Sequence, residues 1–195
     1  MSDIFENYLR SVMPLTQEEL QQILSLSVTK KVRRRQLLLE EGEVCLYKIF
    51  ITKGLLKSYL LKSDGSEHIM RFAPEQTWLT DHESYMHQTP SKYFIEAIED
   101  THVLLWTRDH FNMLMDNIPA LKAYSIRIVS NSLNASQERI RMHISATSEE
   151  KYQEFVAAFP QLANRIPLHL IASYLGVSRE TLSRIRHAQR MVKPS

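Results

Sequence analysis

The side chains best suited to contact a charged partner lie near the C-terminus of the chain. Residues 164–195 contain six Lys or Arg residues and one acid, Glu180, which gives this segment a net charge of +5. The whole chain carries +2, so residues 1–163 sum to −3. A basic end on a mildly acidic body is the charge pattern expected of a segment that binds nucleic acid. The basic residues are Arg165, Arg179, Arg184, Arg186, Arg190 and Lys193.

Two short helices joined by a tight turn must position these residues. Pro167 opens an apolar helical pattern, because the first helical turn needs no amide donor. Gly176 interrupts the pattern and can adopt a positive φ, which permits a sharp turn. Ser178 then offers its hydroxyl to an early amide of the second helix, as an N-cap residue does. The apolar positions are Leu168, Ile171, Ala172 and Leu175 in the first helix and Leu182, Ile185 and Ala188 in the second.

This spacing predicts a helix-turn-helix, whose second helix enters the major groove of DNA. The small side chain of Ala172 lets the two helices cross closely, and Leu182 and Ile185 hold the second against the first. The alternative is an ordinary helical hairpin with a solvated basic face, and the charge excess favours DNA binding over it. The outer side of the second helix carries Arg179, Glu180, Ser183, Arg184, His187 and Arg190.

Composition excludes several classes of protein. The single cysteine, Cys45, rules out an internal disulfide and a cysteine-only iron–sulfur cluster or zinc site within one chain. The four glycines form no phosphate-binding loop. No segment approaches the roughly 20 apolar residues that span a membrane, and the acidic N-terminus is unlike a secretory signal. We therefore expect a cytoplasmic protein.

The chain before the basic segment divides into short helices, a strand-rich body and a long helix. Thr16 and Glu19 form a capping box that opens a second short helix after one ending at Pro14. Residues 27–107 contain β-branched and aromatic clusters separated by turns, the clearest being the Asp64-Gly65 hairpin, and predict an antiparallel sandwich or jelly roll. The basic run over 30–35 is predicted to be a solvated strand face in preference to a second nucleic-acid patch.

A helix from about residue 120 to 144 carries a narrow apolar stripe on a 3-4 repeat, with a polar interruption at Ser136-Gln137. Such a stripe on a long helix favours contact with a second copy of the helix. Packing onto the sheet of the same chain stays open as the alternative. The stripe, called the dimer seam below, consists of Ile126, Val129, Leu133, Ile140 and Ile144.

This order of elements, ending in the motif Ser178-Arg179-Glu180-Thr181-Leu182-Ser183-Arg184, resembles the Crp–Fnr superfamily of bacterial transcription regulators over nearly the whole chain. The resemblance implies an α+β protein with an N-terminal antiparallel β jelly-roll barrel of the cyclic-nucleotide-binding type. We assign residues 1–117 to this sensor domain, 118–145 to a dimerisation helix and 146–195 to an all-α helix-turn-helix domain. No wing is evident after the recognition helix, because only residues 191–195 follow it.

The resemblance also implies which residues contact DNA. Arg179, Glu180 and Arg184 match the residues that contact base edges, and arginine can indeed bind guanine O6 and N7 while glutamate accepts from cytosine N4. We predict a homodimer on a palindromic operator in double-stranded DNA, with RNA polymerase as a candidate further partner. Contacts to the DNA backbone or flanking bases are predicted for Ser178, Thr181, Ser183, Arg186, His187 and Arg190.

The sensor pocket departs from the family. Its cyclic-nucleotide cassette resembles Phe-Gly-Glu-Leu followed by Arg-Ser-Ala or Arg-Thr-Ala, where this chain has Leu79-Thr80-Asp81-His82 and Ser91-Lys92-Tyr93. Asp81 is shorter than the glutamate, and Lys92 lacks the two-pronged geometry of arginine. We therefore predict a degenerate pocket that does not bind cyclic AMP, and its effector stays open. The candidate pocket residues are Trp78, Thr80, Asp81, His82, Lys92 and Tyr93.

Two other functions stay open. One is a ligand-binding β-barrel module without DNA regulation. The other is a cupin-like metalloenzyme, suggested by His82, Glu83 and His87, although the usual His-x-His pair is absent. Haem bound through a histidine is also open, but no histidine is singled out. We expect no enzyme activity, no metal and no cofactor.

Overall fold

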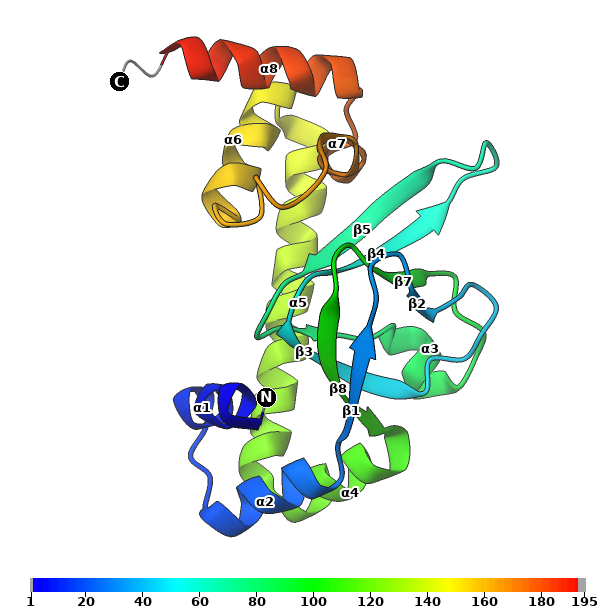
Figure 1. Cartoon of the computed structure of the whole chain (residues 1–195), viewed down its shortest axis with the longest axis vertical. Helices are drawn as coiled ribbons and strands as arrows, with labels where there is room; N and C mark the ends of the chain where they lie inside the picture. The colour runs from blue at the N-terminus through cyan, green and yellow to red at the C-terminus, as the bar shows by residue number, and fades with distance from the viewer. Residues whose placement is uncertain (1, 193–195) are drawn as a thin grey trace. The chain divides into compact units, whose positions relative to one another are not determined.

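A computed structural model describes residues 2–192 of the chain (Figure 1). The chain folds into two compact units. The first unit comprises Met1–Leu60 and Arg71–Ser130, and the second comprises Leu61–Met70 and Asn131–Ser195. The second unit therefore contains a piece of the strand-rich region as well as the C-terminal helices. The described helices are α1 (Ser2–Val12), α2 (Gln17–Ser25), α3 (His82–His87), α4 (Arg108–Asn117), α5 (Pro119–Ser145), α6 (Ser148–Ala158), α7 (Leu168–Leu175) and α8 (Arg179–Val192).

Eight strands form two antiparallel four-stranded sheets among the described residues. One sheet has the order β1-β8-β3-β6 and the other the order β2-β7-β4-β5. Neighbours within a sheet are mostly distant in sequence, as in a jelly roll. The predicted α+β class with an antiparallel N-terminal barrel is confirmed. The strands are β1 (Val28–Val32), β2 (Leu37–Leu39), β3 (Tyr47–Lys53), β4 (Leu56–Leu61), β5 (Glu67–Ala73), β6 (Trp78–Leu79), β7 (Phe94–Ala97) and β8 (Thr101–Thr107).

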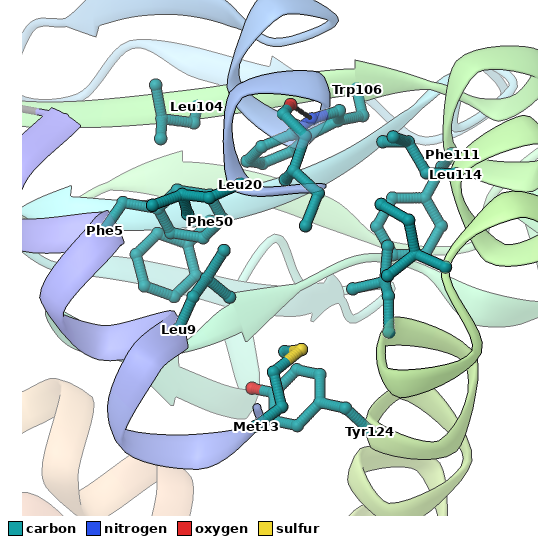
Figure 2. Close-up of a cluster of buried hydrophobic side chains, with 13 residues drawn as sticks. Phe5, Leu9, Met13, Leu20, Phe50, Leu104, Trp106, Phe111, Leu114 and Tyr124 are labelled. Atoms are coloured by element: carbon teal, nitrogen blue, oxygen red, sulfur yellow. Dashed lines mark hydrogen bonds between the residues drawn. The ribbon is translucent and has the colours of Figure 1, made fainter. Parts of the chain in front are cut away.

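An aromatic cluster joins the N-terminal helices to the sheet of β3 and β8 in the first unit (Figure 2). The ring centroid of Phe5 lies 4.6 Å from that of Phe50 and 5.2 Å from that of Trp106. The indole Nε1 of Trp106 donates to the backbone oxygen of Ile23 at 2.8 Å, so the only polar atom of this buried side chain has a partner. The cluster therefore fixes α1 and α2 on one face of the sheet.

A second cluster fills the space between the two sheets of the first unit. Its members come from alternate positions of the strands, as expected where one face of each strand is buried. The alternation explains the β-branched pattern in the sequence. The buried residues include Val32, Leu39, Ile49, Ile51, Leu56, Leu79, Ile95, Val103 and Leu105.

Local sequence signals set most of the helix ends. The capping box at the start of α2 is confirmed: Thr16 Oγ1 accepts from the amide of Glu19 at 3.1 Å, and the Glu19 carboxylate accepts from the amide of Thr16 at 2.8 Å. Helix α5 covers the range predicted for the long helix. Helix α3 was not predicted, because its six residues lack a helical apolar pattern. Within residues 2–192, no helix combines the length and the apolar character needed to cross a membrane.

We expect Leu9→Ala to lower the free energy of unfolding of the first unit by about 2–5 kcal/mol, because Leu9 is fully buried in the aromatic cluster. Urea unfolding followed by tryptophan fluorescence measures this directly, since the chain has two tryptophans and both belong to or pack against this cluster. Ile4→Ala is the matched control on α1, where the side chain is 42% exposed. Equal losses for the two variants would contradict the assigned packing of α1.

Candidate nucleic-acid interface

The turn between α7 and α8 has the geometry predicted for a helix-turn-helix. Gly176 adopts the left-handed conformation, with φ 66° and ψ 34°, directly after α7 ends. The amide of Val177 donates to the carbonyl oxygen of Ala172 at 3.0 Å, which closes the end of the helix. An L-residue with a side chain would be strained at this φ, so a glycine is favoured at this point.

Ser178 begins α8 as the predicted N-cap. Its Oγ accepts from the amide of Thr181 at 3.1 Å and donates to Thr181 Oγ1 at 3.0 Å. Two of the three hydroxyls predicted to contact DNA are therefore hydrogen-bonded to each other at the helix start. Leu182, one residue further along, is fully buried. The cap and this buried leucine together set where α8 starts and which side faces inward.

The outer side of α8 exposes most of the residues predicted to contact DNA. Arg186 is half-buried, and the side chain of Arg190 lies outside the described part of the chain. Ala188 is exposed, so its predicted place on the buried face was wrong. The 14 residues of α8 extend about 21 Å and the eight of α7 about 12 Å, so α7 cannot cover all of α8. The exposed residues are Arg179, Glu180, Ser183, Arg184 and His187.

Helix α6, which precedes α7 and α8 in the chain, packs against both of them. Thr147 and Glu150 form a capping box that the sequence analysis did not identify, with Glu150 Oε2 2.8 Å from the amide of Thr147. Tyr152 and Phe155 are buried, and the Phe155 ring centroid lies 5.7 Å from that of Tyr174 on α7. The helix ends at Ala158, and a series of turns follows over residues 160–165. The helix-turn-helix therefore rests on a small core of its own.

The predicted dimer seam is exposed along α5. Its five side chains have exposed fractions between 47% and 81%. By contrast, Leu121 and Tyr124 near the start of α5 are buried. The members in the first unit are Ile126 and Val129, and those in the second unit are Leu133, Ile140 and Ile144.

Trp78, predicted in the sensor pocket, contributes to the aromatic cluster. Its ring centroid lies 5.1 Å from that of Phe50 and 5.3 Å from that of Trp106. Its Nε1 donates to the hydroxyl of Tyr124 at 3.1 Å. That hydroxyl is also 2.5 Å from the hydroxyl of Tyr8, and burial raises the pKa of Tyr124. Trp78 is therefore held by packing and by a hydrogen bond within the first unit.

Asp81 and the segment Ser91–Tyr93 lie close together, and they bind each other. Ser91 Oγ donates to Asp81 Oδ2 at 2.7 Å and accepts from the amide of Tyr93 at 2.9 Å. The other carboxylate oxygen of Asp81 accepts from the amide of Ser84 at 3.3 Å and caps α3. Both oxygens of the carboxylate thus have partners in the fold. The side chain of Lys92 is exposed.

Other polar groups near α3 are poorly satisfied. The hydroxyls of Thr80 and Tyr85 are buried and make no hydrogen bond. His82 opens α3, and burial and then nearby Lys48 lower its pKa, partly opposed by Asp81. Among the described residues, no group of three or more His, Cys, Asp or Glu side chains is arranged to hold a metal ion. The geometry therefore gives the cupin-like alternative no support.

A cavity of about 300 Å³ lies in the first unit beside β2 and the start of β3. None of the predicted pocket residues lines it. Cys45 is one of its walls, and burial raises the pKa of this thiol. No periodic signal in the sequence marks this cavity. Its lining consists of Leu38, Leu39, Glu43, Val44, Cys45, Leu46, Tyr47 and Ile49.

Comparison with known proteins agrees with this arrangement. Residues 29–117 match the family model for the cyclic nucleotide-binding domain. An anaerobic regulatory protein of Aggregatibacter actinomycetemcomitans is 28% identical over 184 residues, covering 88% of this chain and 70% of the relative. The fumarate and nitrate reduction regulatory protein of Vibrio cholerae is 26% identical over 183 residues, covering 88% and 72%. In sequence and in fold, the chain thus resembles the Crp–Fnr transcription regulators.

Solved structures that resemble this chain support the same fold. The structure of FixK2 from Bradyrhizobium japonicum aligns with a TM-score of 0.75 at 21% identity, covering 87% of this chain and 88% of that one. The α+β architecture and the sequence resemblance are thus confirmed. The residues assigned to the DNA contacts, the sensor pocket and the seam stay predictions.

We expect Gly176→Ala to destabilise the helix-turn-helix by about 1–2 kcal/mol, because alanine is strained at a φ of 66°. A Cβ at this position would lie 3.4 Å from the His143 ring, so backbone strain and not a severe clash dominates. Thermal unfolding followed by circular dichroism measures the change. Gly176→Asn should lose less stability than Gly176→Ala, because asparagine adopts this conformation more readily than alanine. A fully stable alanine variant would contradict the turn geometry.

Proposed function

We propose that this Crp–Fnr regulator binds double-stranded DNA as a homodimer, with α8 in the major groove of each half of a palindromic operator. The observation that carries the proposal is the asymmetry of α8. Leu182 is fully buried, while Glu180 and Arg184, two residues before and after it, are exposed on the opposite side, and Arg179 is exposed in the first turn. A helix held by one face, with a carboxylate and a guanidinium group on the other and a second guanidinium group at its start, is suited to contact base edges.

In this proposal the side chains of α8 divide into two groups. Arg179 and Arg184 bind guanine through two hydrogen bonds each, and Glu180 accepts from cytosine N4. The second group contacts phosphates or flanking bases and orients the helix without reading sequence. Because phosphate contacts release counterions, the affinity should fall steeply with salt. The second group comprises Ser178, Thr181, Ser183, Arg186, His187 and Arg190.

The dimer seam supplies the proposed contact between two copies. Exposed apolar side chains at this spacing on a 27-residue helix are suited to a two-stranded helix contact. A two-fold axis would place the two recognition helices on half-sites about one helical turn, roughly 34 Å, apart. We place this activity in the cytoplasm, with RNA polymerase as a further partner to which no surface is assigned.

We further propose that cyclic AMP is not the effector. Asp81 stands where a glutamate would hold the ribose hydroxyl in the cassette of the family, and both of its oxygens are occupied by Ser91 and Ser84. The residue at the phosphate position is Lys92, whose side chain is exposed. Binding a nucleotide here would require these contacts to break first, which opposes binding.

Selection from random duplex DNA with the purified full chain tests the proposal. We expect a palindromic site to be recovered without added ligand. Recovery of an asymmetric site would contradict the homodimer. A further outcome is that the protein alone recovers no site, and again none when the selection is repeated with any effector found in a thermal-shift screen. That result would contradict DNA regulation and favour the ligand-binding module. Cyclic nucleotides should give no thermal shift.

We expect Arg179→Ala to weaken binding to the selected operator by about 1–3 kcal/mol and to relax the preference at one base pair, because a bidentate contact is lost. Titration of operator and of a singly changed operator by fluorescence anisotropy measures both effects. Arg186→Ala is the comparison. It should weaken binding to both duplexes equally and reduce the slope of log affinity against log salt concentration by about one, because one phosphate contact is lost. Parent-like selectivity of Arg179→Ala would show that the base-contact assignment is incorrect.

We expect Leu133→Arg to convert the dimer to a monomer, because the side chain is 60% exposed at the centre of the seam and two arginines would face each other across the two-fold axis. Size-exclusion chromatography with light scattering gives the mass directly. The matched control is Asn134→Arg on the adjacent exposed position of α5. A dimer that tolerates Leu133→Arg, or a monomeric parent, would argue against the seam.

A further inference from the structure

The strand β5 lies at the edge of its sheet among the described residues, because it is the last strand in the order β2-β7-β4-β5. A free edge presents a row of backbone N–H and C=O groups that need partners. In the second unit, these groups over Glu67–Met70 are bound by side chains from two helices. We call this stretch the β5 edge.

Ser173 on α7 binds the β5 edge twice. Its Oγ donates to the carbonyl oxygen of Glu67 at 2.6 Å and accepts from the amide of Ile69 at 3.0 Å. Residues 67 and 69 point their backbone groups to the same side of the strand, so one hydroxyl can reach both. Ile69 is fully buried, so its amide would have no water to replace the serine.

Arg139 on α5 binds the same edge and α7 together. Its Nη2 donates to the carbonyl oxygens of Ile69 at 2.9 Å and Tyr174 at 3.3 Å, and its Nη1 donates to that of Met70. The guanidinium carbon also lies 4.2 Å from the centroid of the Tyr174 ring. Tyr174 lies in the last turn of α7, where carbonyl groups lack helical partners. One guanidinium thus joins α5, α7 and the strand.

We propose that the β5 edge is the docking edge of the helix-turn-helix, and that Arg139 and Ser173 are positioning residues for DNA binding. They hold α7, and α8 through the packed turn at Gly176, without contacting DNA themselves. The proposal rests on the function proposed above. It adds that the affinity for operator depends on side-chain contacts to a strand of the sensor sheet.

Four variants of the full chain test the proposal. Ser173→Ala removes both hydrogen bonds to the β5 edge, and Ser173→Thr keeps the hydroxyl. Arg139→Lys keeps the charge but loses the fork that binds several carbonyls. Arg141→Lys is the matched control, because Arg141 is exposed on the same helix and pairs with Glu138. Operator affinity and amide hydrogen exchange at Ile69 and along α7 are measured for each.

We expect Ser173→Ala and Arg139→Lys to weaken operator binding about tenfold and to speed amide exchange at Ile69 or in α7. Ser173→Thr should restore both quantities, and Arg141→Lys should change neither. Restoration by threonine distinguishes the hydroxyl contact from a general loss of packing. If Ser173→Ala does not fold, Arg139→Lys against Arg141→Lys carries the same comparison.

Parent-like affinity in both Ser173→Ala and Arg139→Lys would overturn the proposal, even if exchange at Ile69 became faster. Equal losses in Ser173→Ala and Ser173→Thr would also overturn it. Failure of the parent to select any DNA site would count against the proposed function. In that case, slow exchange at Ile69 that becomes fast in Ser173→Ala and is restored in Ser173→Thr would still support docking of α7 on the β5 edge.

Discussion

The burial of Leu182 is the interaction on which the orientation of α8 depends. It is the one fully buried apolar side chain among the described side chains of α8. This single inner face sets which side of α8 is exposed. The cap at Ser178 sets where the helix begins, and Gly176 sets the direction in which the chain enters it. A longer apolar face would have buried the charged residues that the helix presents.

The helices beneath α8 face a different physical problem. Helix α7 is only eight residues long, and short helices gain little stability from their own hydrogen bonds. Its stability must come from tertiary contacts, and these include apolar packing against α6 and α8 and polar contacts from Ser173 and Tyr174 to neighbouring elements. The same contacts satisfy the open edge of β5. The short helix α7 thus gains tertiary contacts from the edge strand β5, and the backbone groups of that strand gain hydrogen-bond partners from α7.

Local signals in the sequence predicted what local geometry determines. The capping box of Thr16 and Glu19 and the cap of Ser178 each involve residues three positions apart, so a motif is enough to identify them. The turn at Gly176 likewise needs one residue type at one φ. The hydrophobic periods gave the jelly roll and the long helix, because burial of one face imposes the period.

Contacts between distant residues were not predictable in this way. The bond between Ile69 and Ser173 spans 104 positions, and neither residue type signals the other. Trp78 was assigned to a pocket by its place beside the cassette, whereas packing against Phe50 and Trp106 decides where its indole lies. The bond of Asp81 to Ser91 has the same origin, since a carboxylate suited to a ligand is equally suited to cap a helix.

The discontinuity of the second unit has an evolutionary consequence. Because Leu61–Met70 belongs with Asn131–Ser195, the unit that contains α7 and α8 is not one contiguous segment of the chain. Recombination that exchanged only the C-terminal segment with a relative would leave behind the strand that α7 requires. Substitutions in Leu61–Met70 that move the edge of β5 are then expected to require matching substitutions in α5 and α7. Sensor and DNA-binding parts are therefore expected to diversify together, by paired substitution more than by domain shuffling.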